Sequence, residues 1–307
     1  MIKYFVLFLI LSLVLPATGQ TVKMRTRILT SLTNIEIEEY LKRNDVIFIP
    51  IGPIEVHGGL PVDCEYVGPL AVAMNMAEKA DGLVLPHLAF CYPGGTTVGR
   101  GTIYVSSSDF LDYLKIVAHS LLRQGFKTQI YITGHGGSYL QTGSLVREFL
   151  DETKVPILAI DLNTARSNYG TQIAGSENFM YGAYSIAGRL EDIPLDLSGI
   201  ELPEENVEIP ESVFDFPQIP GLDRNKLNQH MALGFYYLSP LQHGGIPKPI
   251  TAAERAQFAE EGAKYIDQFV DSMDIKAIAD GLKWHRKWIN DNILPKYGDL
   301  LDFTPAQ

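Results

Sequence analysis

Short apolar runs alternate with amphipathic segments of helical length along most of the chain. The runs of strand length cover residues 46–51, 83–85, 128–133 and 155–161. Apolar residues recur at helical spacing over 68–79, 107–124, 139–152, 251–273 and 275–293. Regular alternation of strands and helices is typical of a mainly parallel sheet covered by helices on both faces. The pattern therefore predicts one α/β domain with three layers.

The segment after the first apolar run is crowded with groups that bind metal ions. Gly52-Pro53 ends the run, and Glu55 and His57 follow two positions apart. In an extended segment their side chains leave on the same side of the backbone. A turn at Gly58-Gly59 allows Glu65 to return towards them. Carboxylate and imidazole together suit zinc, manganese or iron.

A second strand end supplies a further histidine. The strand predicted at 128–133 is followed by Gly134-His135-Gly136-Gly137. Parallel sheets bind ligands at the edge formed by the carboxyl ends of their strands. We therefore expect His135 to join Glu55, His57 and Glu65 at one metal site, whereas the alternative is four unrelated polar side chains on surface loops.

Two ordered motifs resemble those of a known family. Glu-Val-His-Gly-Gly-Leu-Pro-Val-Asp-Cys-Glu at 55–65 resembles the motif E-x-H-G-x-H-L-P-x-x-x-D of the creatininase (creatinine amidohydrolase) family. Gly125-Phe126, followed by a strand and Gly-His-Gly-Gly, resembles its G-F…N-G-H-G-G-N motif, and the likeness spans roughly residues 27 to 273. Two motifs in the family's order are more specific than either alone.

The resemblance implies a creatininase-like fold and an activity. It implies hydrolysis of a C–N bond in a small cyclic amide or related molecule, with one or two divalent ions, zinc or manganese with iron possible. It also implies a small-molecule substrate and a homo-oligomer, commonly a hexamer. The alternatives are a hydrolase of a sugar- or polyol-derived ring, and a metal-binding pseudoenzyme or small-molecule binding protein.

The family's ligands map onto this chain with some changes. Glu55, His57 and His135 match directly, and Glu65 falls on the bridging Asp once a one-residue deletion is allowed. The Glu that follows the matching His in creatininase is a glycine here, so Glu177 is the candidate replacement, as a metal ligand or as a catalytic group.

Two family histidines are also replaced. The proton-shuttle His corresponds to Ile173, and a His usually found five residues before Gly101 corresponds to Thr96. His87 and Arg100 are possible substitutes or loop residues without chemistry. His243 can supply the missing acid, although a loop histidine satisfied by the backbone is the alternative.

The composition narrows the partners and the compartment. The 307 residues carry a formal net charge of −11 without a basic patch, which argues against nucleic acid as a partner. The two cysteines, Cys64 and Cys91, exclude a disulfide framework but allow one bridge. Cys64 is either a soft metal ligand or, as a buried Cys usually is, a small apolar residue.

The N-terminus has the features of an export signal. Lys3 precedes an apolar stretch at 4–15 that is too short to cross a bilayer, and small residues follow at 16–19. We expect a signal peptide at 1–19, a mature domain at 20–307 that starts near Gln20, no membrane association after cleavage, and a secreted or periplasmic protein. The alternative is a short uncleaved anchor; the mass of the exported chain distinguishes the two.

One long segment lacks any periodic pattern. Residues 194–229 are rich in proline and acidic residues and precede His230. Irregular stretches of this length inside a domain are typical of lids, binding loops or subunit contacts.

Overall fold

The computed structural model describes residues 24–198, 236–237, 243–244 and 248–302. The expected signal peptide, most of the segment 194–229 and His230 lie outside these residues. Their predicted roles therefore stay predictions, as does the homo-oligomer. Among the described residues, no helix is both long enough and apolar enough to cross a membrane.

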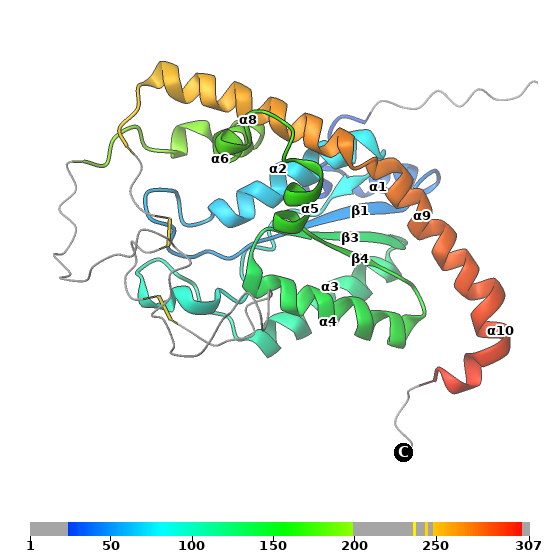
Figure 1. Ribbon diagram of the computed structural model, residues 1–307. Coiled ribbons are helices and arrows are strands. Elements are labelled where there is room, and N and C mark those ends of the chain that lie inside the picture. Colours follow the sequence, from blue (N-terminus) through cyan, green and yellow to red (C-terminus); the bar gives the residue numbers. More distant parts are fainter. Residues whose placement is uncertain (1–23, 199–235, 238–242, 245–247, 303–307) are drawn as a thin grey trace, which may run out of the picture.

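A four-stranded parallel sheet lies at the centre of the fold (Figure 1). Its strands follow the order β2 (Leu83–Val84), β1 (Val46–Ile51), β3 (Thr128–Thr133) and β4 (Leu158–Asp161). Ile51 pairs with Thr133, which pairs with Asp161, so three strands end at the same edge. The predicted parallel sheet is confirmed, although β2 and β4 are shorter than expected.

Helices cover both faces of the sheet and make the two outer layers (Figure 1). Alternate residues of β1 point to opposite faces, because side chains alternate along a strand. Phe48 joins a core with α2 (Cys64–Lys79), α6 (Phe179–Ile186) and α8 (Ala252–Ser272). Ile49 joins a second core with α3 (Ser107–Arg123) and α4 (Gly136–Thr153). The predicted three-layer α/β fold is confirmed.

Several helices differ from their predicted limits. Helices α2 and α4 begin four and three residues earlier than their apolar periodicity indicates. At α4 this happens because the side chain of His135 accepts a hydrogen bond from the backbone N–H of Ser138 and so caps the helix. The helices α1 (Asn34–Leu41), α5 (Leu162–Tyr169) and α6 were not predicted, since each has only eight residues.

The C-terminal helix is less buried than expected. It comprises α9 (Ile275–Trp288), a π-helical segment (Ile289–Ile293) and α10 (Leu294–Tyr297). Ile275 is buried against the body, but Trp284 is 64% exposed. Trp284 and Trp288 lie four positions apart, a spacing that predicts one packing face against the body or a sister subunit. Trp288 is also exposed, at 39%, and a contact with a sister subunit stays a prediction.

Both cysteines are free and buried, so the possible bridge between Cys64 and Cys91 is not formed. Cys64 packs in the core that contains α2, which matches the interpretation as a small apolar residue. Burial raises the pKa of its thiol, which disfavours the thiolate that metal binding requires.

Candidate metal centre

The loop after β1 folds back so that its two ends meet. The backbone N–H of Glu55 donates to the carbonyl oxygen of Val62 at 2.8 Å, and Gly58 takes a positive φ of 57° at the turn. Glu65 follows in the first turn of α2. A Cβ on Gly52 would lie 2.1 Å from the carbonyl oxygen of Glu65, so only glycine allows the strand end to approach α2 so closely. The loop thereby brings Glu65 back to Glu55.

Four side chains converge at this edge of the sheet. One potential ligand atom from each of Glu55, His57, Glu65 and His243 lies within 4.8 Å of the others. The Nε2 atom of His243 is 3.1 Å from Oε1 of Glu55, and the rings of His57 and His243 meet edge to face at 4.4 Å between centroids. In the part of the chain that the structure describes, no other group of three or more such residues comes together in this way.

His135 lies beside this cluster. Its Nε2 atom is 3.7 Å from Oε1 of Glu55 and 3.9 Å from Oε2 of Glu65. Its Nδ1 atom accepts from the backbone N–H of Ser138 at 3.1 Å, so a neutral ring carries its hydrogen on Nε2, towards the two carboxylates. His135 is therefore placed to donate to the carboxylates, and as a metal ligand it would need the other tautomer.

The donor set fits a divalent metal ion. Three buried atoms of the cluster, Nδ1 of His57, Oε2 of Glu65 and Nδ1 of His243, have no hydrogen-bond partner. A buried polar atom without a partner costs free energy that is ordinarily recovered by a ligand or water. Two carboxylates and two imidazoles are the groups that zinc and manganese bind in proteins.

Thr96 holds the central carboxylate. Its buried hydroxyl donates to Oε2 of Glu55 at 2.5 Å, while His243 contacts the other oxygen. Thr96 stands where the family usually has a histidine, and this departure was the only sequence signal that pointed to the position. His87 and Arg100 are exposed and belong to no cluster, so neither replaces it.

The cluster changes the protonation of its members. Burial would raise the pKa of Glu55, but hydrogen bonds from Glu65, His243 and Thr96, together with the charge of His135, outweigh burial and lower that pKa to about 2. Burial and the neighbouring Glu55 raise the pKa of Glu65 well above the usual range. Burial, together with His243, lowers the pKa of His57 to about 4. In the metal-free protein, one proton is therefore kept between the two carboxylates, and His57 is neutral.

This arrangement predicts the pH dependence of metal binding. A metal ion binds Glu65 only in its ionised form. Because the pKa of Glu65 is raised, protons compete with the metal ion at pH values above those at which a carboxylate ordinarily titrates. His57 is already neutral at these pH values and does not add to the competition. We expect the apparent zinc affinity of the wild type to fall as the pH is lowered from neutrality. In Glu65→Gln, affinity at neutral pH should be weaker and less dependent on pH. Zinc titrations across this range measure both, and equal pH slopes in the two proteins would contradict the assignment.

Glu177 and the cluster are joined by a cavity of about 330 Å³. His57 and Glu65 line it together with Arg166, Ser176 and Glu177. Glu177 lies in the short 3-10 helix Ser176–Asn178 and is not among the four clustered residues. The structure thus places Glu177 on the pocket wall, where it can act on a bound molecule. The expectation that it binds metal stays a prediction.

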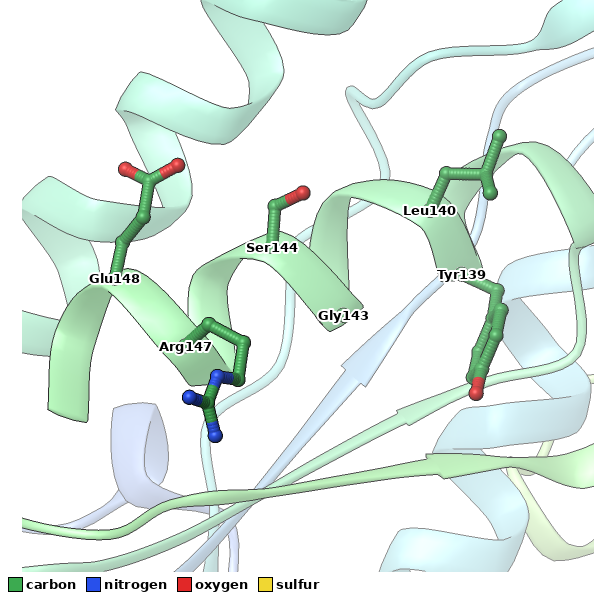
Figure 2. Close-up of a pocket in the computed structure, with 6 residues that line it drawn as sticks. All are labelled: Tyr139, Leu140, Gly143, Ser144, Arg147 and Glu148. Atoms are coloured by element: carbon green, nitrogen blue, oxygen red, sulfur yellow. The ribbon is translucent and has the colours of Figure 1, made fainter. Parts of the chain in front are cut away.

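A second hollow lies along α4, away from these groups. Figure 2 shows Tyr139, Leu140, Arg147 and Glu148 around it, all on this one helix. None of them belongs to the metal cluster. We consider the 330 Å³ cavity for the substrate, because His57 and Glu65 of the metal cluster line it.

Comparison with known proteins supports a family assignment. The family model "Creatininase: Creatinine amidohydrolase" matches residues 30–184, half of the chain. The chain therefore belongs to the creatininase family, whose description is that of a hydrolase, as its motifs predicted. The solved structures below share its α/β fold.

Individual relatives are more distant. A 3-dehydro-scyllo-inosose hydrolase of Thermotoga maritima is 30% identical over 135 residues, and this match spans 43% of each chain. A crystal structure of creatinine amidohydrolase is 18% identical, with a TM-score of 0.55 over 85% of this chain and 98% of that one. A putative creatinine amidohydrolase of Bacteroides fragilis is also 18% identical, with a TM-score of 0.56 over 83% and 98%. Creatininase structures are known in Zn–Zn and Mn forms.

Proposed function

We propose that this protein is a metal-dependent hydrolase that opens a small cyclic molecule at a carbonyl carbon. The observation that carries the proposal is the cluster of Glu55, His57, Glu65 and His243, with three buried atoms that lack partners, beside a cavity large enough for a small molecule. These four residues would hold one or two divalent ions, and membership of the creatininase family supports this role.

When bound, the metal supplies a water molecule of lowered pKa and polarises the carbonyl of the substrate. The side chains of the protein orient the substrate and transfer protons to and from it. Thr96 and His243 fix Glu55 from both of its oxygens, and His135 faces the carboxylates with a hydrogen-bond donor. His57 is neutral, so one of its ring nitrogens keeps a lone pair that can bind a metal ion.

Two groups are placed to protonate the leaving atom. His243 lies at the cluster, and its Nδ1 atom has no hydrogen-bond partner, which supports a role in the site over the alternative of a loop histidine satisfied by the backbone. Glu177 faces the same cavity as the metal site. Glu177 can deliver a proton while all four clustered residues hold the metal, and His243 can do so only if the other three hold it. The family's shuttle histidine, which is Ile173 here, therefore has candidate replacements.

A second candidate substrate class is favoured by one comparison. The family description names an amide hydrolase, which indicates a cyclic amide. The relative from Thermotoga maritima is named a hydrolase of 3-dehydro-scyllo-inosose, a polyol-derived ring, and it is 30% identical over its matched part. Attack of water at a carbonyl carbon serves both classes. It breaks the C–N bond of a cyclic amide, with the amine as the leaving group, or the C–C bond between the two carbonyl groups of a 1,3-diketone ring, with an enolate as the leaving group that is then protonated. The chemistry of the metal site therefore does not choose between them.

The test is a comparison of metal-free and metal-loaded protein on both classes. We expect turnover with zinc or manganese and none after chelation, with reloading restoring it. The panel contains creatinine, a five-membered lactam and a tetrahydroxycyclohexane-1,3-dione, and the mass of the product identifies the bond that is cleaved. Turnover that survives complete removal of metal would overturn the proposal. Full metal loading without turnover of any ring would instead support the binding-protein alternative.

A further inference from the structure

The cavity beside the metal cluster has a second polar wall. It comes from α5 and the short helix at 176–178, which contribute Asn163, Arg166, Ser176 and Glu177. His57 and Glu65 line the same cavity. A small molecule that reaches the metal site with its carbonyl therefore contacts this wall with other groups. Polar side chains placed in this way fix orientation and specificity in small-molecule sites.

Arg166 is held in place without being neutralised. Its Nε donates to the hydroxyl of Tyr265 at 3.3 Å, and its Nη2 donates to the carbonyl oxygen of Ser176 at 3.1 Å. The guanidinium carbon lies 4.1 Å from the centre of the Phe179 ring. Among the described residues, no carboxylate forms an ion pair with it. Because a guanidinium has five N–H donors, three are left for a ligand.

The neighbours of Arg166 provide acceptors. The side-chain nitrogen of Asn163 donates to the carbonyl oxygen of Gly134 at 2.6 Å, which fixes the amide and leaves its oxygen as an acceptor. Within the described ranges, the carboxylate of Glu177 has neither a hydrogen-bond partner nor an ion pair. The wall thus combines oriented donors with oriented acceptors.

We propose that this wall selects a ring that carries several hydroxyl groups beside its carbonyl, with Arg166 as the specificity-determining residue. A hydroxyl group both donates and accepts, so neighbouring hydroxyls match Arg166, Asn163 and Glu177 together. Arg166 is half-buried, and Asn163 and Glu177 are exposed, so a ring without hydroxyl groups forgoes these hydrogen bonds, two of which involve charged groups. The inference rests on the proposed function only in placing the carbonyl group of the ligand at the metal site. Recognition of the hydroxyl groups by the wall is a separate interaction.

The test uses metal-loaded protein and three probes that differ in their hydroxyl groups. These are a pentahydroxycyclohexanone, cyclohexanone and creatinine, and affinity is measured by calorimetry independently of turnover. We expect the hydroxylated ketone to bind at least about tenfold more tightly than either other probe, since only this probe gains several hydrogen bonds to the wall, including bonds to the charged groups of Arg166 and Glu177. Equal affinity for the three probes, or tighter binding of creatinine, would overturn the inference.

Variants assign the preference to the wall. Arg166→Met should weaken binding of the hydroxylated ketone at least about tenfold and leave cyclohexanone unchanged, and Arg166→Lys should recover part of the loss. Glu177→Gln, which removes a charge without disturbing any described partner, should also weaken it and serves if Arg166→Met does not fold. Arg147→Met on α4 is the matched control for loss of an arginine (Figure 2). Wild-type affinity in both Arg166→Met and Glu177→Gln would overturn the proposal.

Two further measurements distinguish a failure of this inference from a failure of the proposed function. A purely structural role of Arg166 would lower metal content and weaken binding of all three probes alike, whereas a recognition role leaves metal content and cyclohexanone binding unchanged and raises KM more than it lowers kcat. Selective binding of the hydroxylated ketone, together with no turnover of any member of the hydrolysis panel, would remove the proposed function and leave the recognition wall intact. Hydrolysis of creatinine alone would support the proposed function and remove the inference about the wall.

Discussion

Glu55→Gln should abolish metal-dependent hydrolysis and most metal binding. We expect this substitution, which replaces one carboxylate oxygen by an amide nitrogen, to cause the largest loss of activity of any single change. Three residues of the site surround the carboxylate of Glu55: His243 at 3.1 Å, Thr96 at 2.5 Å and His135 at 3.7 Å. Replacing groups that only support metal ligands costs about 10- to 100-fold in affinity or activity, so loss of the central carboxylate should exceed about a hundredfold. Metal analysis and steady-state kinetics measure the effect.

The matched control is Glu152→Gln on α4. Glu152 also pairs with a histidine, His119, at 2.7 Å, but this pair is on the surface and outside the metal cluster. The control should keep wild-type metal content and turnover. If Glu55→Gln bound metal and turned over substrate like Glu152→Gln, the cluster would not be the metal centre.

Gly182→Ala should give the largest loss of stability. Gly182 of α6 lies against Gly262 of α8, and a Cβ added there would be 2.1 Å from the backbone carbon of Gly262. Backbone cannot move aside as a flexible side chain can, so the two helices must separate. Overpacking ordinarily costs about 1–3 kcal/mol, and we expect a value of about 3 kcal/mol here. Urea denaturation of the two proteins measures the difference.

Gly281→Ala tests the same substitution without the contact. Gly281 lies within α9, and nothing approaches its added Cβ within 4 Å. Because alanine favours the helix over glycine by about 1 kcal/mol, this variant should be equally or more stable than the wild type. A small effect of Gly182→Ala, comparable to that of Gly281→Ala, would mean that α6 and α8 do not pack as closely as described.

Local patterns in the sequence were sufficient for the sheet and for part of the site. β1 and β3 occupy the residues that their apolar runs predicted. α8 begins at Ala252, where the helical spacing over 251–273 predicted, and Thr251 and Glu254 form a capping box at its start. Glu55, His57 and Glu65 were found because strand, turn and helix lie within one short stretch of chain, where spacing alone constrains which side chains meet.

Local sequence patterns could not predict which residues from distant parts of the chain meet through tertiary contacts. The arrival of His243 at Glu55 spans 188 positions, and nothing in its own loop distinguishes it from a histidine without a role. Arg166 lies on α5, which is too short to show a periodicity, and its exposure to the cavity depends on Phe179 and Tyr265 beneath it.

The sequence by itself determined the parallel α/β architecture, the edge of the sheet that carries the site and three of its four clustered residues, because these follow from side-chain alternation and from turns within a few residues. The tertiary structure alone decided that His243 completes the cluster and that His135 stands beside it. It also decided that Glu177 faces the cavity from the wall, because these placements depend on how separate segments pack against one another, and local spacing carries no information about that packing.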